Sequence, residues 1–199
     1  MNLPGEKDRI PEKNMRILVL ADTDDISEFD DKPEADVLIS CGDIANQTII
    51  RVANLSRCSR IFAVKGNHDS GSPFSSPILD LHLTVRNYGG ITFGGFRGSW
   101  KYKSRGNYLF EQEEAGKLLA SFPPVDIFVA HNSPRYIHDK DDEIHFGFEA
   151  FSSYIERARP KYFLHGHQHL EQETLIGKTR VIGVYGRKRL EILLTKEQR

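Results

Sequence analysis

Short apolar runs recur along this chain, and polar or glycine-containing stretches separate them. Runs of this length between turn residues are typical of β-strands. The pattern predicts strands over residues 15–21, 36–40, 60–65, 82–88, 90–94, 125–130, 161–165, 170–175, 179–184 and 189–194.

Three other segments space their apolar residues at helical intervals. The segment 46–57 opens on Asn46, a residue type suited to capping a helix N-terminus. The segment 111–121 begins with acidic residues and is followed by two prolines, which favour a helix that starts and stops there. The segment 148–158 places apolar side chains on one face and ends before a proline.

The order of these elements predicts a mixed α/β fold. Strands and helices alternate in the first third of the chain, which favours parallel pairing there. Strands crowd together after residue 160, with turns at Gly177 and Gly186, and this pattern favours antiparallel pairing. We find no internal repeat, and we expect a flexible leader over residues 1–14 followed by a single domain over 15–199.

Composition narrows the class of protein. The 199 residues suffice for a sizeable core, and 27 Lys+Arg balance 28 Asp+Glu, so binding to nucleic acid is not favoured. Cys41 and Cys58 lie in an apolar run and a predicted helix, which argues against a disulfide framework. No segment has the pattern of a secretory signal or a membrane span. We expect a cytoplasmic protein without membrane contact, and the sequence makes no prediction of its oligomeric state.

Residues that can bind metal follow five of the apolar runs. In folds of this class, the loops at the carboxyl ends of the strands gather around the ligand. A set of carboxylates, an amide and imidazoles can hold two divalent cations, which activate a water and clamp a phosphoryl group. The residues are Asp22, Gly42-Asp43, Gly66-Asn67-His68-Asp69, His131 and Gly166-His167-Gln168-His169.

One carboxylate has to bridge the two cations, so it should lie on a short, rigid turn. Asp43 is the candidate, because Gly42 lets the backbone turn closely before it. Taken singly, each acidic residue could be a helix cap and each histidine a partly buried side chain. Their common place after strands makes coincidence a poor explanation.

The ordered motifs resemble those of the calcineurin-like metallophosphoesterase superfamily, from residue 15 to about 185. The resemblance implies a four-layer α/β/β/α sandwich, in which two facing mixed β-sheets are flanked by helices. It also implies two metal-ligand sets that share Asp43. The first metal would be bound by Asp22, Asp43 and His169, and the second by Asp43, Asn67, His131 and His167.

The same resemblance assigns roles to two residues that do not bind metal. His68 is similar to the family's active-site histidine, which stabilises the phosphoryl group or protonates the leaving oxygen. Asp69 would orient His68 through a hydrogen bond, which raises the basicity of the imidazole.

The sequence departs from the family at its first motif, Asp-any-His, which here reads Asp22-Thr23-Asp24. Asp24 could replace the histidine, directly or through water, in a harder and more anionic site. Alternatively, Asp24 is too short and the first metal binds loosely, or the site holds one metal and is slow or inactive. We expect two divalent cations with Asp24 among the ligands; Mn²⁺ is the leading candidate, and Fe, Zn, Mg or Ni are the alternatives.

Several residues near the motifs receive weaker predictions. We expect His165 to be a neighbour of the metal site rather than a ligand, and His82 and His138 to lie at the surface. The acidic loop 139–143 reads as a solvated turn and, with His145, as a place for contacts that select the substrate. Arg97 could reach an anionic substrate, and Trp100 or Tyr102 could stack on a base.

The leading hypothesis is metal-dependent hydrolysis of a small phosphoester. A diester is preferred because residues 131–134 and 161–167 resemble small stand-alone phosphodiesterase-type members. One alternative is a nuclease similar to the double-strand-break repair exonuclease of this superfamily, which the balanced charge disfavours. A second alternative is a metal-poor interaction module, which the loss of the first-motif histidine suggests and the other ligands oppose.

Overall fold

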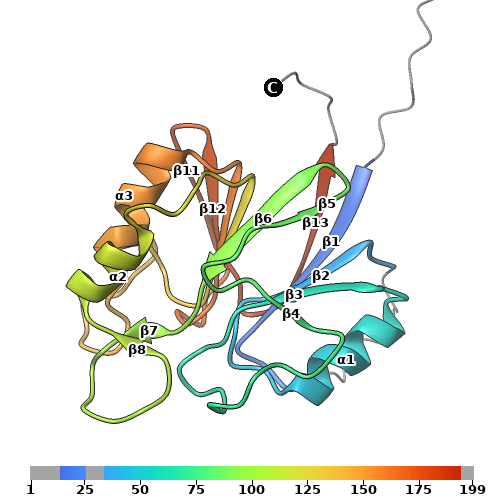
Figure 1. Cartoon of the computed structure of the whole chain (residues 1–199), viewed down its shortest axis with the longest axis horizontal. Helices are drawn as coiled ribbons and strands as arrows, with labels where there is room; N and C mark the ends of the chain where they lie inside the picture. The colour runs from blue at the N-terminus through green and yellow to red at the C-terminus, as the bar shows by residue number, and fades with distance from the viewer. Residues whose placement is uncertain (1–13, 26–33, 194–199) are drawn as a thin grey trace, which may run out of the picture.

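The computed structural model describes residues 14–25 and 34–193, and two facing β-sheets form its centre (Figure 1). The predicted leader 1–14 lies outside the described residues, except for Asn14, with which the first strand begins. Helices α2 and α3 cover the outside of one sheet and α1 lies outside the other (Figure 1). The fold class predicted from the resemblance is therefore confirmed. No helix in the described part of the chain has the length and apolar character needed to cross a membrane.

The first sheet has the strand order β13-β1-β2-β3-β4. Strands β1 to β4 run parallel to one another, as the alternation of strands and helices predicted. Strand β13, at the edge, pairs antiparallel with β1. Helix α1 connects β2 to β3. The bounds are β1 Asn14–Ala21, β2 Val37–Ser40, α1 Asn46–Leu55, β3 Arg60–Ala63, β4 Leu79–Asp80 and β13 Gly186–Leu193.

The second sheet has the order β11-β12-β10-β9-β6-β5, and a short pair β7-β8 lies apart. Strands β12, β10, β9 and β6 are parallel, with β11 and β5 antiparallel at the two edges. The bounds are β5 Arg86–Tyr88, β6 Ile91–Phe96, β7 Ser99–Trp100, β8 Leu109–Phe110, α2 Gln112–Leu119, β9 Ile127–Ala130, α3 Glu149–Ala158, β10 Tyr162–His165, β11 Gln172–Ile176 and β12 Thr179–Gly183.

The core has three layers, and strand β1 belongs to two of them. Ile17 and Val19 face the cluster between the sheets, whereas Leu18 and Leu20 face the cluster under α1. Successive side chains of a strand point to opposite faces, so a strand covered on both sides is apolar throughout. A third cluster, rich in phenylalanine, fills the space between the second sheet and helices α2 and α3.

The three helices and most strands lie where the sequence predicted them. The predicted strand 82–88 shrinks to 86–88, and β4, β7 and β8 were missed because two-residue strands carry no pattern. Antiparallel pairing after residue 160 is correct for β11 with β12 and for β13, but it is wrong for β10. Strand β10 follows helix α3, and a helical crossover returns the chain parallel to the preceding strand.

The predicted cap at Asn46 is also wrong. The N-cap residue of α1 is Ala45, which makes no side-chain capping bond. The Asn46 amide oxygen instead accepts a hydrogen bond from Lys65 Nζ at 3.3 Å.

Phe128 offers a test of the phenylalanine cluster. Its ring is fully buried and stacks on Phe163 with the centroids 5.1 Å apart. We expect Phe128→Ala to lower the free energy of unfolding by about 3–5 kcal/mol, because the lost ring leaves a cavity. Urea denaturation would measure this. Leu175→Ala, at a side chain that is 65% exposed, is the control and should cost less than about 0.5 kcal/mol; equal costs for the two variants would contradict the assigned core.

Candidate metal centre

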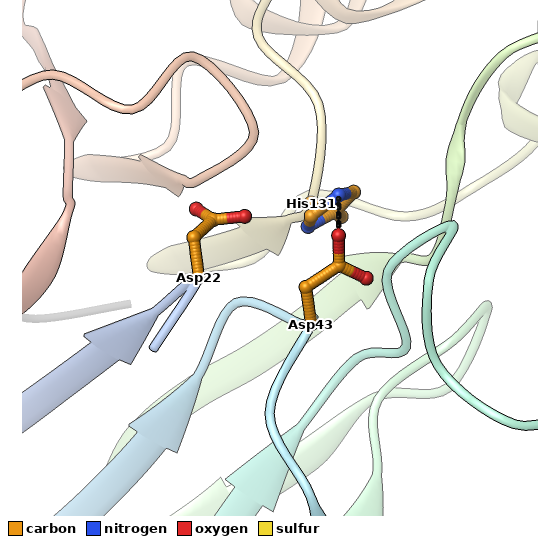
Figure 2. A group of neighbouring side chains, drawn as sticks. All are labelled: Asp22, Asp43 and His131. Atoms are coloured by element: carbon orange, nitrogen blue, oxygen red, sulfur yellow. Dashed lines mark ion pairs between the residues drawn. The ribbon is translucent and has the colours of Figure 1, made fainter. Parts of the chain in front are cut away.

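The candidate metal ligands lie where strands of both sheets end. Asp22 follows β1 and Asp43 follows β2 in the first sheet, whereas His131 follows β9 in the second. Figure 2 shows these three side chains pointing toward one another across the seam between the sheets. Their ligand atoms all lie within 4.8 Å of one another, a spacing that suits a bound cation.

His131 presents one nitrogen to this cluster and uses the other to hold its ring. Its Nε2 lies 3.3 Å from Asp43 Oδ2 and 2.9 Å from Asn67 Oδ1. Its Nδ1 donates to the carbonyl oxygen of Cys41 at 2.9 Å. Metal-binding histidines are commonly fixed by a carbonyl in this way, so Nε2 is the nitrogen available to a cation.

The carboxylate of Asp22 is buried and only partly hydrogen-bonded. Its side chain is 2% exposed, and Oδ2 accepts a hydrogen bond from the His167 backbone N–H at 2.8 Å. Oδ1 is buried and has no hydrogen-bond partner among the described residues, although His169 Nε2 lies 3.8 Å away. A buried carboxylate oxygen without a donor is costly. A metal ion beside Oδ1 would remove that cost, so the donors present fit the cation that the fold family implies.

The two histidines of the Gly-His-Gln-His motif differ in exposure. His167 is buried with its ring centroid 4.9 Å from that of His131, and its Nε2 faces the Ile144 carbonyl at 3.1 Å, which leaves Nδ1 for a metal. His169 is 57% exposed and stacks on Tyr185. The candidate metal centre is therefore buried on the His167 side and open to solvent on the His169 side.

The electrostatics of the cluster follow from its burial. Burial raises the pKa of Asp22 to about 6. Burial alone would raise the pKa of Asp43 as well, but the charge of His131 and its hydrogen bond lower it to about 2. For His131, burial is outweighed by Asp43 and Asp22, and its pKa rises to about 9. The carboxylates thus hold one positive charge between them, and a divalent cation can take its place.

The backbone at the ligands is strained in a consistent way. Asp22, Asp43, His167 and His169 all have a positive φ, of 55°, 55°, 64° and 50°. A non-glycine residue in this region costs on the order of 1–3 kcal/mol and persists where surrounding structure imposes it. Four such residues in one cluster indicate that the loops are shaped for ligand placement.

Two glycines let the carboxylates approach the neighbouring backbone. A Cβ at Gly66 would lie 2.1 Å from Asp43 Oδ1, and a Cβ at Gly166 would lie 2.5 Å from Asp22 Oδ2. Any larger residue would displace the carboxylate. This contact explains why each histidine-containing motif begins with glycine.

The hydrogen bonds found for Asp69 differ from the one that the resemblance implied. Its Oδ2 accepts hydrogen bonds from the backbone N–H groups of Asp43, at 3.0 Å, and Gly66, at 2.7 Å. None of the hydrogen bonds found among the described residues joins it to the His68 ring. Two converging N–H groups satisfy this carboxylate, so Asp69 ties two ligand loops together. His68 is exposed, and its backbone N–H donates to Asp43 Oδ1 at 2.8 Å.

Asp24 lies apart from the cluster of Asp22, Asp43 and His131. It is exposed, and its Oδ1 accepts a hydrogen bond from the Ala45 N–H at 2.9 Å, at the start of α1. It lines a cleft of about 500 Å³ together with Asp43, Lys65 and His68. Its role as a ligand remains a prediction, with one of its two oxygens already bonded.

Three further histidines lie deeper than the surface, although two of them, His82 and His138, were expected there. His165 is buried beside the site as expected, with Nδ1 donating to the Gly166 carbonyl oxygen at 3.0 Å. His138, which we expected at the surface, is buried, and its Nδ1 lies 2.9 Å from His165 Nε2. His82 is half-buried, and its Nδ1 accepts from the Arg97 N–H. No local pattern signals these pairings, because the partners are 15 and 27 residues apart along the chain.

Lys65 is a residue of the site that the sequence interpretation missed. It is 3% exposed, and its Nζ lies 4.2 Å from the centre of the Phe74 ring. Among the described residues it forms no salt bridge. Its place in the sequence could have indicated it, because Lys65 ends an apolar run directly before Gly66. Tyr102 also reaches the site, where its hydroxyl accepts a hydrogen bond from Asn67 Nδ2 at 3.2 Å.

Solved structures with this fold come from several organisms. A putative 5′-nucleotidase from Staphylococcus aureus in complex with alpha-ketoglutarate matches 90% of this chain at 14% identity and TM-score 0.57; this chain spans about half of that protein, 51%. Phosphopantetheinyl hydrolase from Mycobacterium tuberculosis matches at 13% identity and TM-score 0.55, over 85% of this chain and 89% of that one. Wild-type Vps29 from Entamoeba histolytica, complexed with zinc, matches at 14% identity and TM-score 0.50, over 86% and 74%.

At these identities the likeness to solved structures establishes the fold alone. No curated protein sequence matches the chain significantly. The model of the calcineurin-like phosphoesterase family, however, matches residues 15–171, a span that contains every candidate ligand. The chain therefore belongs to the calcineurin-like phosphoesterase family, as its ordered motifs predicted.

Proposed function

We propose that this protein hydrolyses a small phosphodiester with a water activated between two divalent cations. The observation that carries the proposal is the convergence of Asp22, Asp43 and His131, with a buried Asp22 oxygen that has no hydrogen-bond partner among the described residues. Two cations held there would lower the pKa of the water and neutralise charge on the phosphoryl oxygens.

The ligands divide into two sets around Asp43. In this proposal Asp22 and His169 bind one metal beside Asp43, and Asn67, His131 and His167 bind the other. Asp43 is suited to the shared position because two backbone contacts fix its turn: its own N–H donates to Asp69, and its Oδ1 accepts from His68. The mixture of nitrogen and oxygen donors suits Mn²⁺, with Fe, Zn, Mg or Ni as alternatives.

His68 is the candidate for the general acid. Its backbone is anchored to Asp43, while its exposed side chain lines the open cleft next to that ligand. From this position the imidazole would give a proton to the leaving oxygen as the bond to phosphorus breaks.

The cleft supports an anionic substrate with a modest charge. Lys65 brings a buried cation to a wall that also carries Asp24, Asp43 and Asp69. A diester has one negative charge fewer than a monoester, and it meets less repulsion from those carboxylates. The resemblance of residues 131–134 and 161–167 to phosphodiesterase-type members supports the same preference.

A non-catalytic interaction protein is the second candidate. Its support is the engagement of Asp24 with Ala45, which leaves the first metal with fewer ligands than the family's set. A fold of this kind binds zinc in Vps29 from Entamoeba histolytica. A bound metal alone therefore does not distinguish the two candidates, and turnover has to be measured.

The first test measures metal content and turnover together. Protein purified without chelator should contain close to two metal ions per chain and should hydrolyse a chromogenic diester when Mn²⁺ is added. Asp43→Asn should weaken metal binding by more than the about 10–100-fold that outer-shell changes cost. Asp141→Asn, in an exposed loop, is the matched control. Two bound metals without turnover would favour the interaction protein.

His68 can be tested through the leaving group. His68→Asn should lower kcat by about 10²–10⁴-fold, the range for a lost general acid, with metal content unchanged. The loss should be greater for an alkyl ester than for a p-nitrophenyl ester, because nitrophenolate leaves without protonation. An equal loss for both leaving groups would remove His68 from this role.

The raised pKa of His131, about 9, predicts how metal affinity depends on pH. Its ring is protonated below that value, and a cation must displace the proton to reach Nε2. Apparent affinity should therefore rise with pH up to about 9 and level off above it, and binding at pH 7 should release protons. Calorimetry in two buffers of different ionisation enthalpy measures that release; no difference between the buffers would contradict the assignment.

A further inference from the structure

We propose that His145 supplies the nitrogen ligand that the first metal lacks in this chain, through its Nε2 atom. The inference rests on the metal centre of the proposed function. It concerns the position that the family's first-motif histidine would fill, where this chain has Asp24.

Asp142 fixes the His145 ring in one tautomer. The ring Nδ1 lies 2.8 and 2.9 Å from the two carboxylate oxygens, and Oδ1 also accepts the backbone N–H groups of His145 and Ile144, at 2.8 and 2.9 Å. A carboxylate on Nδ1 keeps the proton there and leaves the lone pair on Nε2. This is the arrangement that orients histidine ligands in metal proteins.

The loop that carries His145 is fastened to the Gly-His-Gln-His motif. The His145 carbonyl oxygen accepts a hydrogen bond from Gln168 Nε2 at 2.8 Å. One residue earlier, the Ile144 carbonyl oxygen lies 3.1 Å from His167 Nε2. These contacts hold His145 against the two histidines that the motif contributes to the metal centre.

The ring of His145 lies at a distance that allows metal binding. Its centroid is 6.5 Å from that of His169, which the proposal assigns to the same metal, and 5.4 Å from that of His167, which it assigns to the neighbouring metal. Imidazoles that bind one ion at about 2.1 Å have centroids about 4.5–6.5 Å apart, from the bond length and ring size. The His145 side chain is 22% exposed, and Nε2 makes no hydrogen bond that we find in the described part of the chain.

The ligand sets assign His145 to the first metal. The second metal already has Asn67, His131 and His167 beside the shared Asp43. The first metal has Asp22 and His169 beside the shared Asp43. One oxygen of Asp24 already accepts a hydrogen bond from the Ala45 N–H. His145 therefore restores a nitrogen donor to the metal that lost one.

The test compares four variants of the full chain with the wild-type protein: His145→Ala, Asp24→Ala, Asp142→Asn and Asp141→Asn. Mn²⁺ titration by calorimetry gives the number and affinity of sites, and pulsed electron paramagnetic resonance counts nitrogens on the bound Mn²⁺. We expect His145→Ala to weaken one site by at least about 10–100-fold and to remove one nitrogen coupling. Asp142→Asn should weaken the same site less, and Asp141→Asn, the matched loop control, should change nothing.

Asp24→Ala separates the two possible replacements. If it leaves both sites intact, His145 is supported; if it abolishes one while His145→Ala does not, Asp24 is the ligand and the inference is wrong. Unchanged sites in His145→Ala would also overturn it, including the case in which only KM rises and His145 contacts substrate. Added imidazole should restore the lost site in His145→Ala, a rescue that a misfolded loop would not give.

These readouts do not depend on turnover. If the wild-type protein binds two metals but hydrolyses no diester, the proposed function fails and the His145 assignment is still decided by the variants. If the wild-type protein binds no metal, both fail.

Discussion

The structure depends on two buried carboxylates, Asp22 and Asp43, which follow neighbouring strands of one sheet. Both lie close to the His131 ring of the other sheet. Buried negative charge is tolerated only when cations or hydrogen bonds compensate it. The surrounding features follow from this constraint. Backbone N–H groups donate to two of the four carboxylate oxygens, and the His131 ring lies beside a third. Glycines make room for the carboxylates, and the residues that carry them have left-handed backbone conformations.

Much of the fold could be predicted from the sequence because the central strands are covered on both faces. In β1, residues on alternate sides enter different clusters, and both clusters are apolar, so the strand reads as one continuous run. The position of the candidate ligands was predictable for a related reason. A polar residue directly after such a run must lie at the end of a buried strand, and strand ends of this fold meet in one place.

The errors concern contacts between residues that are far apart in the sequence. Asp69 is 26 residues from Asp43, whose N–H donates a hydrogen bond to the Asp69 carboxylate. His138 is 27 residues from its partner His165. Neither pairing leaves a local pattern. The cap at Asn46 failed similarly, because Lys65 competes for its side chain. Local propensity predicts elements, whereas the choice of partner for a polar group depends on the finished fold.

The candidate ligands come from both sheets, and this has a consequence for the stability of the fold. Asp22 and Asp43 belong to one sheet, and His131 and His167 belong to the other, so an ion bound among them joins the two halves of the sandwich. Its binding free energy then contributes to the cohesion of the fold as well as to chemistry. A cation bound there would therefore stabilise the sandwich whether or not it also takes part in a reaction.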